Sequence, residues 1–189
     1  MNVVKIKDIA NVSSGTYQKE ILDGDFLYLQ IKDFTSSHLD KGELNPTIPH
    51  TGSTAKHLLM NKDLLFAAKG TSNFCVLYNN RLGQAIASTS FFIIRLTVAS
   101  ILPEFLCWYI NLPQVIKKLR SKAVGSFTPS ITKDILMNLS VNIPSLPAQQ
   151  RIVNLNQLRK KEHELQVKLT EKKEQVYNQV LMNILKSNQ

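Results

Sequence analysis

The sequence has few cysteines and no long hydrophobic run, and both absences limit where the protein can work. Cys75 and Cys107 are its only cysteines among 189 residues, and no spacing motif connects them, so a disulfide between the two stays open at this point. Thiols of this kind are typical of proteins in a reducing compartment. No apolar stretch reaches the roughly 20 residues that a helix needs to cross a bilayer. The first ten residues lack the apolar core of a signal peptide. We therefore expect a cytoplasmic protein that makes no membrane contact.

The sequence also lacks the residue patterns that most enzyme sites require. It contains no phosphate-binding loop, no nucleophile elbow and no HExxH zinc motif. Its four histidines have no cysteine or paired acid at metal-ligand spacing. Neither cysteine has a histidine nearby in the sequence that could activate a thiolate. The sequence therefore predicts a protein without catalytic activity, cofactor or metal.

Positive charge is what the sequence has in excess. It holds 23 lysines and arginines against 14 aspartates and glutamates, a formal net charge of +9. Residues 1–147 contribute 15 basic and 10 acidic side chains, and residues 148–189 contribute 8 and 4. An excess in both parts favours a polyanionic partner, of which nucleic acid is the commonest. Charge alone leaves open a basic protein that has no such partner.

Residues 1–146 show the short apolar runs of a β-rich domain. Residues 1–12 predict a strand followed by a short helix, and the alternating segment 26–34 predicts a further strand. Four apolar runs between residues 63 and 96, separated by turn residues, predict a β meander. Helices are expected to begin at Pro103 and Pro113, because proline suits the first helical turn. A short helix capped by Ser130 and a strand over "LSVNIP" complete the domain.

Residues 147–189 predict one long helix, with no glycine and no proline after Pro147. Pro147 suits the first helical position, and Gln149 suits the third, where its amide can reach back to the N-cap N–H. About forty residues at 1.5 Å each give a length of roughly 60 Å. Apolar side chains follow the spacing of a coiled-coil seam, interrupted by Glu162 and by Lys172 or Lys173. The seam positions are Leu155, Leu158, Leu165, Leu169, Val176, Val180 and Ile184.

A single helix cannot bury such a seam, so it needs a partner helix. No second long amphipathic helix precedes it in the sequence, and a second copy of the chain is the simplest partner. The predicted fold class is therefore α+β: a β-rich mixed globular domain in residues 1–146, followed by a long C-terminal coiled-coil helix in residues 147–189.

Four stretches, in this order and spacing, resemble one repeat of the specificity subunit of type I restriction–modification systems. They are "VVKIKDIANVSSGTY", "NKDLLFAAKGTSN", the run from "ILPEFLCWYINLPQ" to "IPSLPAQQRIV", and the long charged helix. A complete subunit of that family holds two recognition domains and two conserved helical regions. This chain holds one of each and contains no internal repeat, so it resembles a half-subunit.

The resemblance implies that residues 1–146 form a target recognition domain that enters the DNA major groove. Loop side chains would read base edges while lysines and arginines hold phosphates. Lys32 and Lys69 are the preferred cationic contacts, and Gly70 would let the backbone approach the duplex. Gln30 and Asn73 are candidate readers of adenine. The expected DNA-binding residues are Lys19, Gln30, Lys32, Lys56, Lys69, Gly70, Thr71, Ser72, Asn73 and Arg81.

The resemblance also implies partners. Two copies joined through antiparallel helices would read a bipartite, palindromic double-stranded DNA target. The helices would dock the methyltransferase subunits and, with them, the restriction subunit. Those partners would carry out adenine methylation with S-adenosylmethionine and ATP-driven cleavage, and this chain would hold neither cofactor. Three alternatives stay open: a stand-alone dimeric DNA-binding protein, a coiled-coil interaction module with no role on DNA, and an enzyme whose site the sequence patterns do not reveal.

Overall fold

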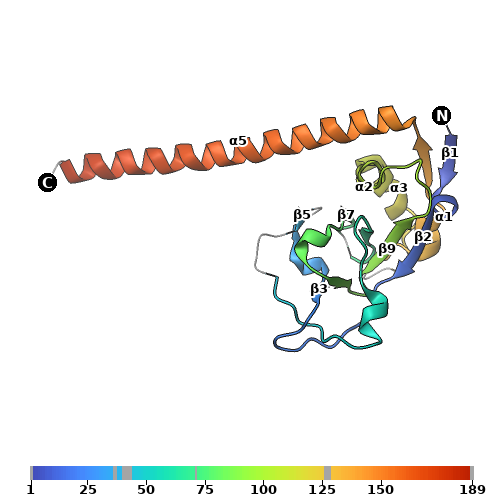
Figure 1. The fold of residues 1–189 in the computed structure, drawn as a ribbon. Helices are drawn as coiled ribbons and strands as arrows, with labels where there is room; N and C mark the ends of the chain where they lie inside the picture. The colour runs from blue at the N-terminus through green and yellow to red at the C-terminus, as the bar shows by residue number, and fades with distance from the viewer. Residues whose placement is uncertain (1, 36–37, 40–43, 71, 126–128, 188–189) are drawn as a thin grey trace. The chain divides into compact units, whose positions relative to one another are not determined.

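The computed structural model has the expected α+β architecture, in which strands and short helices precede one long C-terminal helix (Figure 1). It describes residues 2–35, 38–39, 44–70, 72–125 and 129–187. The chain divides into two units, residues 1–150 and 151–189. Among the described residues, none of the helices combines the length and apolarity that crossing a membrane requires.

A four-stranded antiparallel sheet forms the centre of the first unit. Its strands, in order across the sheet, are β2 (Ala10–Ser14), β9 (Phe91–Leu96), β6 (Leu64–Ala67) and β7 (Cys75–Leu77). All four residues of β6 are buried, because the strand lies in the interior of the sheet. The strands fall on the apolar runs seen in the sequence, since burial of those runs is the main force that stabilises the sheet.

The expected meander is wrong, because one of its four runs leaves the sheet. β8 (Ala85–Ala87) pairs in parallel with β3 (Leu27–Leu29), and β9 returns to lie beside β6. All three residues of β8 are fully buried. Parallel pairing is typical of strands that are covered on both faces, which small alanine side chains permit here.

A turn interrupts the strand expected over residues 26–34. The Asp33 carboxylate accepts a hydrogen bond of 2.7 Å from the backbone N–H of Gln30, and this contact closes a 3₁₀ turn. β3 therefore ends before Gln30. The smaller elements of the unit are β1 (Asn2–Lys5), α1 (Ile6–Ile9), η1 (Ile31–Asp33), β4 (Phe34–Thr35), β5 (His38–Leu39), η2 (Thr54–His57) and η3 (Asn80–Leu82).

Both proline-initiated helices are present, as α2 (Pro103–Ile110) and α3 (Pro113–Arg120). The N-cap of α4 (Lys133–Met137) is Thr132, whose hydroxyl accepts the N–H of Ile135 at 3.3 Å. The expected cap, Ser130, is wrong by two residues. Its backbone instead exchanges hydrogen bonds of 2.9 and 3.0 Å with Val124, which holds it outside the helix.

A side chain covers the outer edge of β7. The Asn111 amide, just beyond α2, accepts the Cys75 N–H at 2.8 Å and donates to the Cys75 carbonyl at 2.6 Å. It therefore occupies the groups that an additional strand would need. Burial raises the pKa of the Cys75 thiol well above its ordinary value, so that thiol stays neutral.

The long helix α5 (Leu146–Ser187) begins beside the strand pair formed by β1 and β10 (Ser140–Ile143). Gln149 in its first turn is fully buried, and its side chain makes three hydrogen bonds to backbone groups. Its NH₂ group donates to Ser100 and Pro144 at 3.0 and 2.9 Å, and its carbonyl accepts the Leu102 N–H at 2.9 Å. The expected contact with the N-cap of the same helix is therefore wrong. The amide instead ties the start of α5 to the loop before α2.

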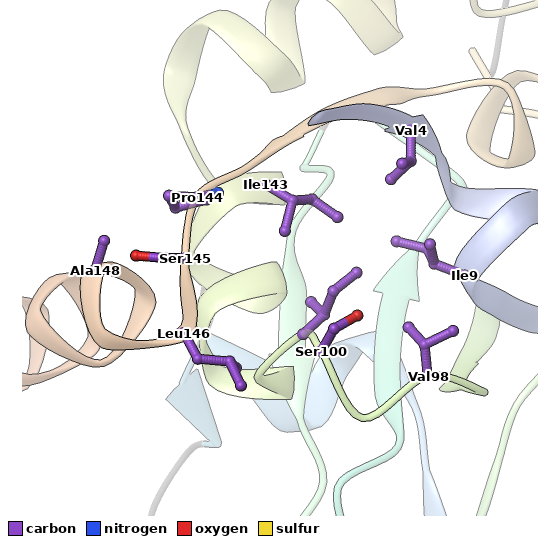
Figure 2. A pocket seen from close by; sticks show the side chains of 10 residues that line it. Val4, Ile9, Val98, Ser100, Ile143, Pro144, Ser145, Leu146 and Ala148 are labelled. Atoms are coloured by element: carbon purple, nitrogen blue, oxygen red, sulfur yellow. The ribbon is translucent and has the colours of Figure 1, made fainter. Parts of the chain in front are cut away.

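An open pocket of about 560 Å³ lies beside this junction (Figure 2). It is lined mainly by apolar side chains from β1, α1, the 98–101 segment and the residues around the start of α5. None of the ten lining residues carries a charge, so the pocket is unsuited to holding the DNA backbone.

Candidate nucleic-acid interface

Three loops meet at one end of the four-stranded sheet, which we call the loop end. β2 and β6 finish there, and β7 and β9 begin there, as the strand register requires. The facing pairs at this end are Ser14 with Phe92, Ala67 with Phe91, and Phe66 with Cys75. The loops comprise residues 15–20, 68–74 and 88–90. Loops that a rigid sheet holds at one end are a common site for binding residues.

The first loop packs backbone to backbone on the third. The Gly15 N–H donates to the Phe91 carbonyl at 2.9 Å, and the Thr16 N–H donates to the Ala87 carbonyl at 3.0 Å. A Cβ atom on Gly15 would overlap the carbonyl oxygen of Ser88. Glycine is therefore required by the close approach of two chain segments at the loop end.

Replacing Gly15 with alanine should destabilise the domain by about 1–3 kcal/mol, because the added methyl group forces the two loops apart. Urea unfolding followed by the fluorescence of Trp108 measures this loss. Gly52→Ala is the matched control, since a Cβ there meets no atom within 4 Å. Equal unfolding midpoints for the two variants would contradict the proposed close packing.

The second loop carries Lys69, Gly70 and Ser72, and hydrogen bonds fix it on both sides. The Ala68 N–H donates to the Ser90 carbonyl at 3.0 Å, and the Gly70 N–H donates to the Pro129 carbonyl at 3.1 Å. Gly70 has a φ of 84°, a left-handed conformation that glycine adopts readily. Lys69 and Ser72 are exposed. Thr71, also expected to contact DNA, lies outside the described residues.

Asn73 has a structural role that its sequence context did not predict. It is buried, its amide donates to the Ala67 carbonyl at 3.0 Å, and its oxygen accepts the Arg120 Nε–H at 2.9 Å. Both ends of the amide are therefore engaged within the protein. We remove Asn73 from the candidate base readers and assign it to holding the loop.

The contact between Asn73 and Arg120 brings the C-terminal end of α3 to the loop end. This stretch also carries three exposed lysines, Lys117, Lys118 and Lys122. Sequence reasoning did not include them among the DNA contacts, although the run "KKLRSK" was a visible signal. Its apolar spacing indicated a helix, and nothing in the local pattern placed that helix near the 68–74 loop.

The remaining expected DNA contacts do not all lie at the loop end. Lys19 is exposed in the first loop. The Gln30 amide donates to Glu20 at 2.7 Å, and the Leu29 carbonyl beside it accepts the Ser88 N–H at 2.9 Å. Lys32 follows in η1 and is exposed.

Lys56 is exposed and shares with residues 13–16 a hollow of about 390 Å³. Arg81 differs, because it follows β7 and so lies at the opposite end of the sheet. It is exposed, but the structure does not group it with the loop-end residues.

Arg95 also lies towards the opposite end of the sheet and is held by a buried acid. Its Nε and Nη2 atoms donate to the two carboxylate oxygens of Asp63 at 2.8 and 2.6 Å, and Asp63 is only 1% exposed. Hydrogen bonding to Asp63 raises the pKa of Arg95 above its ordinary value. The guanidinium therefore stays charged and balances a buried carboxylate, which is a structural role.

The seven predicted seam positions of α5 are all between 50% and 70% exposed. Further large apolar side chains on the same helix are exposed as well: Val167, Tyr177, Leu181, Met182 and Leu185. This amount of exposed apolar surface on one helix is typical of an interface.

Known proteins resemble this chain in sequence. Residues 1–175 match the family model described as the type I restriction modification DNA specificity domain. Over 105 residues the chain is 30% identical to the type I restriction enzyme HindI specificity subunit of Haemophilus influenzae. That match covers 53% of this chain and 23% of the relative.

Solved structures share the fold. The S subunit of a type I restriction–modification system from M. genitalium superimposes with a TM-score of 0.61 at 14% identity, covering 86% of this chain and 40% of that chain. The HsdS subunit from Thermoanaerobacter tengcongensis gives 0.61 at 22% identity, covering 87% and 43%. The chain therefore spans less than half the length of these relatives.

Proposed function

The chain belongs to the family of type I restriction modification DNA specificity domains, and from this membership we propose that it recognises DNA for such a system without catalysing a reaction itself. The observation that carries the proposal is the loop end, where strand register and backbone hydrogen bonds gather Lys19, Lys69 and Ser72. The Asn73–Arg120 contact adds the basic end of α3 to the same place.

The loop end would bind the duplex in two ways. The exposed lysines neutralise phosphates, which positions the domain but carries no sequence information. Short polar side chains such as Ser72, and the Gln30 amide, read base edges in the major groove. Glu20 holds the Gln30 amide at 2.7 Å, which favours one orientation of that side chain before DNA binds.

Replacing Lys69 with alanine should weaken binding to duplex DNA by about 3- to 10-fold at moderate salt and reduce the salt slope by about 1, because one phosphate contact is lost. Fluorescence anisotropy with a mixed-sequence duplex, repeated over a salt series, measures both quantities. Arg81→Ala is the matched control, since it removes an exposed cation at the opposite end of the sheet. An equal loss in both variants would contradict binding through the loop end.

A second copy of the chain is the partner that we propose for α5. Two-fold symmetry would then present two recognition domains to a bipartite, palindromic target. Exposure of the seam supports this proposal. We propose further that the assembled pair directs methyltransferase and restriction subunits to that target.

Methylome sequencing tests this function directly. Cells that carry the gene with its neighbouring methyltransferase gene should gain methylation at a symmetric bipartite motif that is absent without this chain. Methylation that is unchanged while the methyltransferase is active would contradict the proposal. Specific DNA binding without recruitment of a methyltransferase would favour a stand-alone DNA-binding protein. Absence of DNA binding would favour a coiled-coil interaction module.

A further inference from the structure

The seam of α5 contains two charged positions that its own helix leaves without an ion pair. Heptad spacing places Leu155, Glu162, Leu169 and Val176 at one set of core positions, and Leu158, Leu165 and Lys172 at the other. Within the part of the chain that the structure describes, neither Glu162 nor Lys172 forms a salt bridge.

Neutral neighbours contact these two side chains instead. Glu162 accepts a hydrogen bond from Gln166 at 3.4 Å, and Lys172 donates one to Gln175 at 2.9 Å. Ten residues separate Glu162 from Lys172, which is about 15 Å along a helix, so one helix cannot bring them together.

The orientation of the helix pair decides what these charges meet. In a parallel pair each core position faces itself, so Glu162 would face the partner's Glu162 and Lys172 the partner's Lys172. Like charges at close range in a poorly solvated seam repel strongly. In an antiparallel pair the two sets of core positions face each other, and an acid can face a base.

The family resemblance implies antiparallel pairing of two such helices, and we propose that two copies of this chain pair in the one register in which Glu162 faces the partner's Lys172. This inference rests on the proposed dimer and defines its geometry. In the same register Leu158 faces the partner's Val176, and Leu165 faces the partner's Leu169. The two-fold axis then crosses the helices at the level of Val167. The pair of Glu162 with the partner's Lys172 therefore forms twice, once on each side of the axis.

Neighbouring registers lose this match. Sliding one helix by a heptad in one direction sets Glu162 against the partner's Gln179 and Lys172 against the partner's Leu169. Sliding it the other way sets Glu162 against the partner's Leu165 and Lys172 against the partner's Leu155. Both alternatives desolvate charges that have no opposite charge to pair with, which is costly.

The positions that flank the seam do not select the register. Over residues 159–175 they carry Arg159, Lys161, Lys168 and Lys173, together with the uncharged Gln166 and Gln175. Cations therefore meet cations or neutral groups in either orientation, and flank repulsion opposes both. The two charged core positions therefore select the orientation and register of the helix pair. Polar core residues select the pairing of other coiled coils in the same way.

Cysteine cross-linking tests the orientation. A mixture of Glu162→Cys and Lys172→Cys chains should form interchain disulfides under mild oxidation, and peptide mapping should join position 162 to position 172. Each variant alone should stay uncross-linked, because its two cysteines lie about 15 Å apart in the antiparallel dimer. Self-cross-linking of Glu162→Cys alone would overturn the proposal in favour of parallel pairing.

Charge reversal gives an independent measurement on the full chain. Glu162→Lys should raise the dimer dissociation constant by about 100-fold, a typical scale for breaking close charge pairs. The double variant Glu162→Lys with Lys172→Glu should restore it to within about 3-fold, since the pairs are re-formed with reversed sign. Sedimentation equilibrium measures all three proteins, and circular dichroism checks that each remains folded.

The outcomes separate this inference from the proposed function. A dimer that forms but ignores both charge reversals would overturn the register and leave the proposed dimer standing. A wild-type chain that is monomeric at every concentration would overturn both, while DNA binding through the loop end would remain as measured.

Discussion

Replacing Gln149 with leucine should lower the free energy of unfolding by about 3–5 kcal/mol, because three buried backbone groups lose their hydrogen-bond partner at once. The Ser100 and Pro144 carbonyls and the Leu102 N–H are all satisfied by this one amide. Leucine has similar volume but no polar atom. Each orphaned group would then carry a desolvation cost of about 1–3 kcal/mol, relieved in part where water can enter.

Urea unfolding with Trp108 fluorescence measures this loss, and Gln157→Leu is its control. Gln157 lies on the same helix and is exposed, so the same substitution there should change the stability by less than about 0.5 kcal/mol. If both variants unfold at the same urea concentration, the Gln149 amide does not stabilise the domain.

Gln149→Glu tests the two hydrogen bonds that the NH₂ group of Gln149 donates. Glutamate keeps a carbonyl for the Leu102 N–H but turns negative oxygens towards the Ser100 and Pro144 carbonyls. Burial and this repulsion raise the pKa of the new carboxyl in the folded state. Because the folded state then binds the proton more tightly, this variant should gain stability as the pH falls.

The second large effect is expected from the seam. Replacing Leu165 with aspartate should dissociate the proposed dimer and weaken binding to the proposed bipartite target by about 100- to 1,000-fold, because the second half-site would no longer be bound intramolecularly. Binding to a duplex with one half-site should change little, since the loop end belongs to the other unit of the chain.

Val167→Asp is the matched control for this experiment. Val167 is 44% exposed, lies two residues away, and falls outside the heptad core positions, so aspartate there should leave the dimer intact. Anisotropy with duplexes that carry one or two copies of the half-site found by methylome sequencing measures both variants. Equal weakening by the two substitutions would contradict burial of Leu165 in a seam.

Local signals in the sequence predicted the elements of the fold well. Pro103 and Pro113 mark two helix starts, because proline fixes the backbone angle that the first turn needs. The apolar runs at residues 64–68 and 91–96 became β6 and β9, since a run of that length and composition is typical of a buried strand.

Pairings between distant segments were not predictable in the same way. β8 looked like a neighbour of β9, yet it pairs with β3, which lies almost sixty residues earlier. Gln149 fitted a local capping pattern, but its amide meets groups about fifty residues away, which only the folded chain brings close. The choice of pairing partner depended on contacts between distant segments, which no local sequence pattern reveals.

In the candidate interface, too, local features were predictable from the sequence and contacts between distant segments were not. Lys69 and Gly70 were expected as DNA contacts from the family resemblance, and both lie at the loop end. Asn73 had the same sequence context but points its amide inward, where Ala67 and Arg120 bind it. Side-chain direction in a turn depends on what lies beneath it, and here that is the end of α3.

If two copies pair through α5 as proposed, the distance between the two DNA half-sites would depend on the number of heptads in the helix. In the proposed register, residue 150, where the first unit ends, would face residue 184 of the other copy, and the two attachment points would lie about 50 Å apart along the helices. Adding one heptad at the centre of the seam would separate them by about 10 Å more, close to three base pairs of duplex. The proposed dimer would therefore allow the gap between half-sites to change in steps of one heptad, without any change in the loops proposed to read the bases.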